Sequence, residues 1–132
     1  MAQAETLLVD GLNLLGARPD GWWRDRPRAM ARLVDRLDRI ANELPEEVVI
    51  VFDGREHQRV REAETERVGV RFAPGGPDAA DKVIAAMVRS HPTPELVLVV
   101  SSDKRLRNMV RAAGGESVGA GQFTAAHLGG PG

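Results

Sequence analysis

Short apolar runs alternate with amphipathic stretches along this chain. Residues 6–10, 48–52 and 96–101 consist almost wholly of apolar residues, as expected for strands buried on both faces of a parallel sheet. In residues 68–72, valine and phenylalanine alternate with glycine and arginine, which predicts a strand at or near the edge of the sheet. A short last strand is predicted at residues 116–119.

Apolar residues at helical spacing occupy most of the intervals between these strands. The spacing predicts helices over residues 27–44, 78–91 and 104–113, and a helical turn over 124–128. Two polar intervals remain: 11–26 is expected to be a long loop, and 54–66 a loop with a short helix. Strands and helices therefore alternate almost throughout, which predicts a three-layer α/β/α domain with a mostly parallel central sheet.

The length and composition narrow the class of protein. The 132 residues fit a single domain spanning 1–132, with 129–132 expected to be a frayed tail. No stretch approaches the roughly 18 apolar residues that a membrane span requires, and the N-terminus lacks the pattern of a secretory signal. We therefore expect a cytoplasmic protein that makes no membrane contact. The absence of cysteine excludes a disulfide framework, a thiolate zinc site and a cysteine nucleophile.

The cations of this chain are nearly all arginine. Only Lys82 and Lys104 are lysines, and the net charge is −1, so the whole chain has no strong field for nucleic acid. A GC-rich genome would explain the arginines. The suitability of planar guanidinium groups for phosphate contacts would explain them as well. Only the distribution of the arginines in the fold can separate these explanations.

Four aspartates lie where the predicted strands end or the following helices begin. Asp10 and Asp53 end two apolar runs, Asp103 follows a third, and Asp81 lies in the first turn of a predicted helix. In an open α/β sheet the carboxyl ends of the strands share one edge, where ligands bind. Converging carboxylates repel one another unless a cation is bound, so the pattern predicts a divalent-metal site.

Each of these residues also has a purely structural interpretation. Asp78 is a good helix N-cap with Asp81 favoured by the helix dipole, and Ser102 could cap the next helix with Asp103 in its first turn. Asp-Gly at the ends of two strands is also an ordinary turn. Caps and turns alone could use serine, threonine or asparagine, so the occurrence of aspartate at every such position favours a shared cation site.

Three motifs resemble one family, in that family's own order. Residues 8–13, Leu-Val-Asp-Gly-Leu-Asn, are similar to the Asp-Gly-x-Asn opening of NYN domains, a branch of the PIN-like nucleases. Residues 80–84 resemble that family's Ala-Asp-x-x-Ile helix start, and residues 99–106 resemble its strand followed by Ser/Thr-x-Asp. The Gly-Trp-Trp-Arg-Asp-Arg segment at 21–26 looks closest to the bacterial branch.

The resemblance implies a PIN-like domain that hydrolyses RNA as a metal-dependent endoribonuclease. By motif match Asp10, Asp81 and Asp103 would bind Mg²⁺ or Mn²⁺, and Asn13 would orient a ligand or the metal-bound water. Asp53 and Ser102 are further candidates for the catalytic site. The family usually has a polar or acidic residue where this chain has Ala80, and Asp78 could substitute for it.

RNA contacts are expected around the tryptophan pair that follows the first strand. Trp22 and Trp23 are the only tryptophans of the chain, and one of them is expected to be exposed, the one nearer the helix packing on the core. An exposed indole can stack on unpaired bases, and neighbouring cations can hold phosphates. The residues expected to contact RNA are Trp22, Arg24, Arg26, Arg55 and Lys104, with Arg18 and Arg28 nearby.

Two other functions remain open on sequence alone. Ala80 favours an RNA-binding module of the same fold that has weak or no catalysis. A phosphoacceptor signalling domain would use Asp53 together with Ser102 and Lys104, although Lys104 lies too close to Ser102 for that pattern. RNA is the expected partner, with the ribosome or another RNA-presenting partner as an addition, and the oligomeric state is open.

Overall fold

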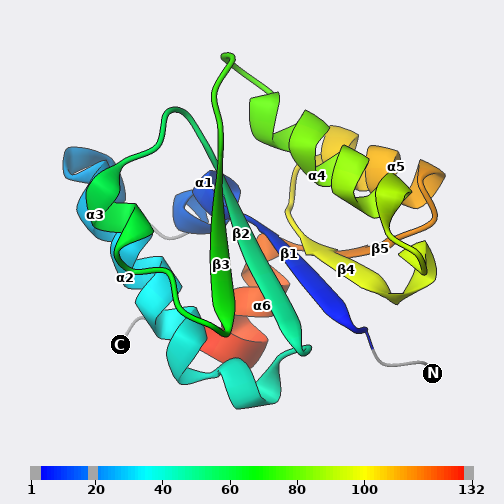
Figure 1. Cartoon of the computed structure of the whole chain (residues 1–132), viewed down its shortest axis with the longest axis horizontal. Helices are drawn as coiled ribbons and strands as arrows, with labels where there is room; N and C mark the ends of the chain where they lie inside the picture. Colours follow the sequence, from blue (N-terminus) through cyan, green and yellow to red (C-terminus); the bar gives the residue numbers. More distant parts are fainter. Residues whose placement is uncertain (1–3, 18–20, 130–132) are drawn as a thin grey trace.

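The computed structural model describes residues 4–17 and 21–129. Its centre is a five-stranded sheet in the order β3-β2-β1-β4-β5, in which every neighbouring pair is parallel (Figure 1). The strands are β1 (Thr6–Asp10), β2 (Glu47–Asp53), β3 (Val68–Ala73), β4 (Val97–Val100) and β5 (Glu116–Val118). The predicted parallel sheet is confirmed, and the alternating strand β3 lies at its edge, as its pattern indicates.

Helices cover both faces of this sheet, which confirms the predicted three-layer α/β/α architecture (Figure 1). The helices are α1 (Gly11–Gly16), α2 (Arg26–Arg39), α3 (Gln58–Arg61), α4 (Ala79–Ser90), α5 (Lys104–Ala112) and α6 (Ala120–Phe123), which continues into a π-helical turn, Thr124–Leu128. Helices α4 and α5 lie together on one side of the sheet, and α2 lies on the other. No helix of the described residues is long and apolar enough to cross a membrane.

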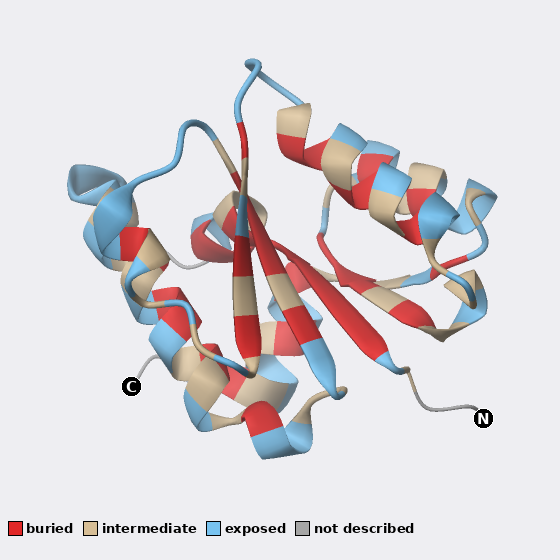
Figure 2. Ribbon diagram, viewed as in Figure 1, coloured by how far each residue is buried: buried red, intermediate tan, exposed pale blue. Residues whose placement is uncertain are grey.

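The core has two parts because successive side chains of a strand point to opposite faces. Leu7 and Val9 of β1 pack into a cluster with α1 and α2, whereas Leu8 packs with α4 and α5. The strands are accordingly buried along most of their length, and exposed residues are concentrated on the outer sides of the helices (Figure 2). The near-continuous apolar runs of the sequence reflect this burial on both faces.

Two predicted elements differ from the structure. Residues 11–26 are not one long loop, because α1 follows β1 directly and a 3₁₀ turn, Trp22–Arg24, precedes α2. A helix of six residues is too short to show a periodic pattern, and Leu14 and Leu15 make it helical by packing on the core. Helix α2 ends at Arg39 and not at residue 44 as predicted, because Ala41–Glu43 forms a separate 3₁₀ turn. The predicted contact residue Arg18 and the tail residues 130–132 lie outside the described residues.

Gly11 permits the tight connection between β1 and α1. It is buried, and a Cβ atom on this residue would overlap the ring of Phe52 and touch the side chain of Ile50 at 3.0 Å. Both neighbours are fully buried strand residues that have little room to move. Glycine is therefore required here by close packing.

Replacing Gly11 by alanine is expected to lower the free energy of unfolding by about 1–3 kcal/mol, since the Phe52 ring must shift in a filled core. Chemical denaturation followed by circular dichroism measures this change. Gly16→Ala is the matched control, because a Cβ at Gly16, in the last position of the same helix, meets nothing within 4 Å. Equal stabilities of the two variants would contradict the packing argument.

Candidate active site at the carboxyl edge of the sheet

The carboxyl ends of the strands bring four aspartates from distant parts of the sequence together. Asp10 ends β1, Asp53 ends β2, Asp103 precedes α5, and Asp81 lies in the first turn of α4. The upper part of Figure 1 shows this edge, where β3 continues through a loop into α4. We call Asp10, Asp53, Asp81 and Asp103 the acidic edge site.

Asp10 is the most enclosed member of the acidic edge site. Its residue is only 5% exposed, and its Oδ2 atom accepts a hydrogen bond of 2.9 Å from the Ser101 hydroxyl. Burial raises the pKa of Asp10 from 3.8 to about 6, against the lowering effects of Ser101 and of the Asn13 backbone N–H, while the charges of Asp81 and Asp53 raise it further. Asp10 is therefore a carboxylate that the fold holds at a cost in free energy.

Asp81 has the same character, although it lies on a helix. It is 7% exposed, and burial raises its pKa to about 6, with the negative charges of Asp103, Asp78 and Asp53 adding to the shift. Arg105 lowers the same pKa. The interactions of Asp10 with Asp81, and of Asp81 with Asp103, connect the three residues that the motif resemblance assigns to metal binding.

Asp103 and its neighbours fix the turn between β4 and α5. The Asp103 carboxylate accepts a hydrogen bond from the Leu106 backbone N–H at 3.2 Å, so Asp103 itself is the N-cap of α5. The prediction that Ser102 caps this helix is wrong. The Ser102 hydroxyl instead accepts from the Ala120 N–H at 2.8 Å, because α6 begins beside this turn.

Asn13 connects α1 to the same turn. Its side-chain Oδ1 accepts a hydrogen bond of 2.8 Å from the Ser102 backbone N–H. This bond crosses 89 positions of sequence and holds the start of α1 against the end of β4. The side chain therefore lies beside the acidic edge site, and its predicted contact with a ligand or a metal-bound water stays a prediction.

The side chain that caps α4 belongs to Asp53 and not to Asp78. The backbone N–H of Ala80, in the first turn of α4, donates to Asp53 Oδ1 at 2.9 Å, so a residue of β2 caps this helix. The prediction that Asp78 is the cap is wrong: Asp78 makes no side-chain capping bond and has a φ of 67°. The Asp78 carboxylate instead forms an ion pair of 3.3 Å with Arg105 of the neighbouring helix α5.

The donor chemistry of this edge suits a hard divalent cation, because Mg²⁺ and Mn²⁺ prefer oxygen ligands. Asp10 and Asp81 are the best placed to hold such an ion, since both carboxylates are buried and destabilised by neighbouring negative charge. Among the residues that the structure describes, no group of three or more acidic, histidine or cysteine side chains is arranged around one point. Asp53 and Asp103 are turned toward helix N-termini, as their capping bonds require.

The predicted RNA-contacting residues do not form one cluster. Trp22 packs partly on the core with the Arg26 guanidinium 5.3 Å from its ring centroid, whereas Trp23 is 56% exposed. One tryptophan is thus exposed, as expected, but it is the one nearer the helix. Arg24, Arg55 and Lys104 are exposed on three separate elements, with Lys104 beginning α5 beside the acidic edge site.

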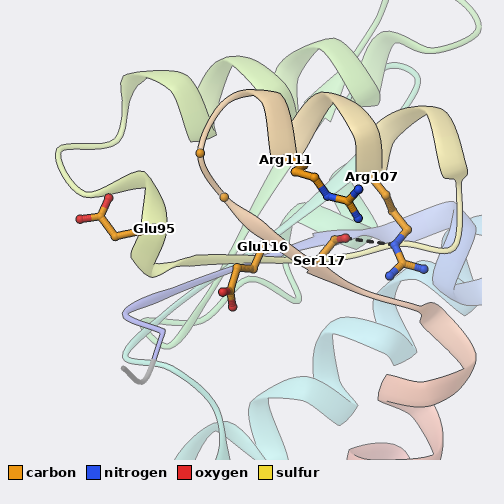
Figure 3. A pocket seen from close by; sticks show the side chains of 7 residues that line it. Glu95, Arg107, Arg111, Glu116 and Ser117 are labelled. Carbon is orange, nitrogen blue, oxygen red and sulfur yellow. Dashed lines mark hydrogen bonds between the residues drawn. The ribbon is translucent and has the colours of Figure 1, made fainter. Parts of the chain in front are cut away.

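A separate cavity of about 470 Å³ lies between α5 and β5, away from the acidic edge site (Figure 3). Arg107 and Arg111 project from α5 toward β5, and Arg107 donates a hydrogen bond of 3.0 Å to the Ser117 hydroxyl. Glu95 and Glu116 also line this cavity and balance the two arginines. The local charge therefore favours neither an anion nor a cation.

The sequence motifs contain two site residues whose roles were not predicted. Ser101 is fully buried and holds the Asp10 carboxylate while its oxygen also accepts from the Asp103 N–H at 3.1 Å. The signal available in the sequence was that Ser101 is a polar residue at the end of an apolar run. Arg105 contacts Asp78 and stabilises the charge of Asp81, but one more arginine in an arginine-rich helix gave no signal.

An all-parallel sheet in this order, covered by helices and edged with acids at its carboxyl ends, defines a PIN-like α/β domain. The chain belongs to the YacP-like NYN domain family, whose pattern matches residues 7–127. This membership supports a nuclease-type function related to RNA.

Two crystal structures of Rae1 (YacP) from Bacillus subtilis share this fold. One aligns with a TM-score of 0.75 and 21% identity over 97% of this chain and 74% of that chain. The other, a point mutant, gives a TM-score of 0.72 and 21% identity over 94% of this chain and 75% of that chain. No curated protein matches the chain by sequence.

Proposed function

We propose that this protein is a metal-dependent endoribonuclease that hydrolyses RNA phosphodiester bonds at the acidic edge site. One observation carries the proposal: Asp10 and Asp81 are buried together at the carboxyl edge, and each has a pKa raised to about 6. Burying two interacting negative charges opposes folding. Carboxylates that a fold keeps in this unfavourable state therefore indicate a functional site. A divalent cation would compensate them.

In this proposal Asp10, Asp81 and Asp103 hold Mg²⁺ or Mn²⁺. The bound ion would neutralise the scissile phosphate and lower the pKa of an attacking water. Ser101 keeps the Asp10 carboxylate in position, and Asn13 keeps α1 against the turn that carries Asp103. Arg105 lies at the start of α5, next to Asp78, where it can contact a phosphate of the substrate.

Membership of the YacP-like NYN domain family leaves the phosphoacceptor interpretation without support. The RNA-binding module without catalysis remains a second candidate. Two features favour it. Ala80 lies where the family usually has a polar or acidic residue, and Asp53 and Asp103 already serve as helix caps. Presentation of the RNA by the ribosome or another partner is compatible with either function and stays a proposal.

Titration of the purified protein with Mn²⁺ in a calorimeter, together with a cleavage assay on labelled RNA, tests the choice. The nuclease proposal expects saturable Mn²⁺ binding and RNA cleavage that requires Mg²⁺ or Mn²⁺ and stops in EDTA. RNA binding without metal binding or cleavage would favour the binding module. Cleavage that persists unchanged in EDTA would contradict the metal-dependent mechanism.

A further inference from the structure

A groove of about 610 Å³, distinct from the acidic edge site, lies between α1, the Trp22–Arg24 turn and α2. Leu14, Leu15, Trp22, Leu33 and Leu128 supply its apolar floor. Five of the chain's arginines and two aspartates also line it, although the whole chain has a net charge of −1. Positive charge therefore exceeds negative charge on this surface, which we call the α1–α2 groove.

The arginines of the α1–α2 groove form a row. Arg28, Arg32 and Arg36 are four residues apart in α2 and so lie along one face of the helix, with Arg24 at the same spacing before it. The Cα atoms of Arg28 and Arg36 are separated by about 12 Å along the helix axis. A row of positive groups with this spacing suits a chain of phosphates better than a single small anion.

Most of this positive charge is available to a ligand. Arg24, Arg28 and Arg32 are exposed and form no ion pair with another residue of the described chain. Arg39 is different, because Asp35 neutralises it at 2.9 Å. Arg36 donates to the Leu128 carbonyl at 2.6 Å, which anchors the C-terminal turn at the end of the row.

An aromatic surface lies at the other end of the row. Trp22 lines the groove with Arg26 over its ring. Trp23 is not among the lining residues but lies beside the groove, packed edge-on against Trp22 at a centroid distance of 6.4 Å. Trp23 is the single large hydrophobic side chain that is exposed among the described residues. Phosphate-binding cations beside an exposed indole are the combination that binds single-stranded nucleic acid, because unpaired bases can stack on the ring.

We propose that the α1–α2 groove is a binding track for single-stranded RNA, in which Arg24, Arg28 and Arg32 contact phosphates and Trp23 stacks on a base. The role of this track in RNA cleavage rests on the proposed function. Binding of RNA to the groove does not depend on it. Helix α1 begins at Asp10 and Gly11 and ends in the groove, so about 9 Å of helix separates the two sites. A single strand that occupies both sites would cross α1.

The test measures binding of a fluorescent single-stranded RNA of about 16 nucleotides by anisotropy, in EDTA so that cleavage cannot interfere. Arg28→Gln/Arg32→Gln is compared with Arg71→Gln/Arg89→Gln, which removes the same charge from exposed positions outside the groove. The groove variant is expected to bind about tenfold more weakly, and its salt dependence to become shallower by about 1.4 in log–log slope. Trp23→Ala is expected to weaken binding about fivefold or more.

The control variant is expected to stay within about twofold of the wild type, and thermal melts of all variants establish that they are folded. Equal weakening by both arginine pairs would overturn the track, since only net charge would then matter. Unchanged RNA binding by the groove variant would also overturn the track, and a protein partner would then be the alternative occupant of the groove. The absence of RNA binding by the wild type would overturn the track as well. Stronger binding of a duplex than of the single strand would contradict the stacking role of Trp23.

Cleavage assays separate this inference from the proposed function. If the groove variant binds RNA weakly and the wild type never cleaves, the track stands and the nuclease proposal fails. If the wild type cleaves and the groove variant binds normally, the nuclease proposal stands and the track fails. With both correct, the groove variant loses cleavage of the long RNA but retains it on a dinucleotide, whose single phosphodiester group occupies the acidic edge site and leaves no phosphate for the track.

Discussion

Asp10→Asn is expected to reduce metal-dependent RNA cleavage at least about 100-fold, because even residues that only support metal ligands often cost 10- to 100-fold. The substitution removes the negative charge but keeps an oxygen that can accept the hydrogen bond from Ser101. The fold should therefore survive. Initial rates on labelled RNA at saturating Mn²⁺, with circular dichroism of the same samples, measure the effect.

Asp103→Asn is a second variant for the same prediction, and it changes the charge with little effect on the helix cap. Asparagine caps a helix about as well as aspartate, so α5 keeps its N-cap while the carboxylate is lost. Glu46→Gln is the charge-matched control, since Glu46 is exposed, precedes β2 at the opposite edge of the sheet and lies outside the α1–α2 groove. Full activity of Asp10→Asn or Asp103→Asn would end the assignment of these carboxylates to the reaction.

The second large effect concerns stability, and it should change with pH. The pKa of Asp10 and of Asp81 is raised from 3.8 to about 6 on folding, so the folded state holds these protons more tightly than the unfolded state. Stability must then fall as the pH rises from about 4 through 6. For Asp10 alone, the difference between 3.8 and about 6 corresponds to roughly 3 kcal/mol, a large part of the total for a small domain.

Asp10→Asn isolates this effect, because the neutral side chain does not titrate. In EDTA the variant should be more stable than the wild type by about 2–3 kcal/mol at neutral pH, and the difference should disappear near pH 4. Mn²⁺ should stabilise the wild type and reverse the order at neutral pH, since a ligand that binds only the folded state adds to its stability. Urea unfolding across this pH range measures both.

Glu46→Gln is again the control, and its stability should run parallel to the wild type at every pH, because an exposed side chain away from the site contributes little. Parallel curves for Asp10→Asn and the wild type would contradict the buried, destabilised state of Asp10. Such a result would also remove the main argument for a cation at the acidic edge site. The gain in stability without metal and the loss of activity are therefore independent tests of one residue.

The sequence predicted most of the fold because its signals were local. Runs such as residues 48–52 are apolar on both faces, as is typical of inner strands of a covered sheet, and residues 68–72 alternate because β3 lies at the edge. Helix α1 was missed because six residues carry no periodic signal and its stability comes from packing. The end of α2 was missed because a 3₁₀ turn continues its apolar spacing.

The sequence alone determined which residues could form the site, since parallel strands must end at one edge and Asp10, Asp53, Asp81 and Asp103 lie at such ends. Only the tertiary structure decided what each carboxylate does there. Hydrogen bonds that join distant segments assigned Asp53 to the N-terminus of α4 and Ser101 to Asp10, and no local pattern encodes such contacts. Burial of Asp10 and Asp81, which raises their pKa values, likewise depends on the neighbours that the completed fold supplies.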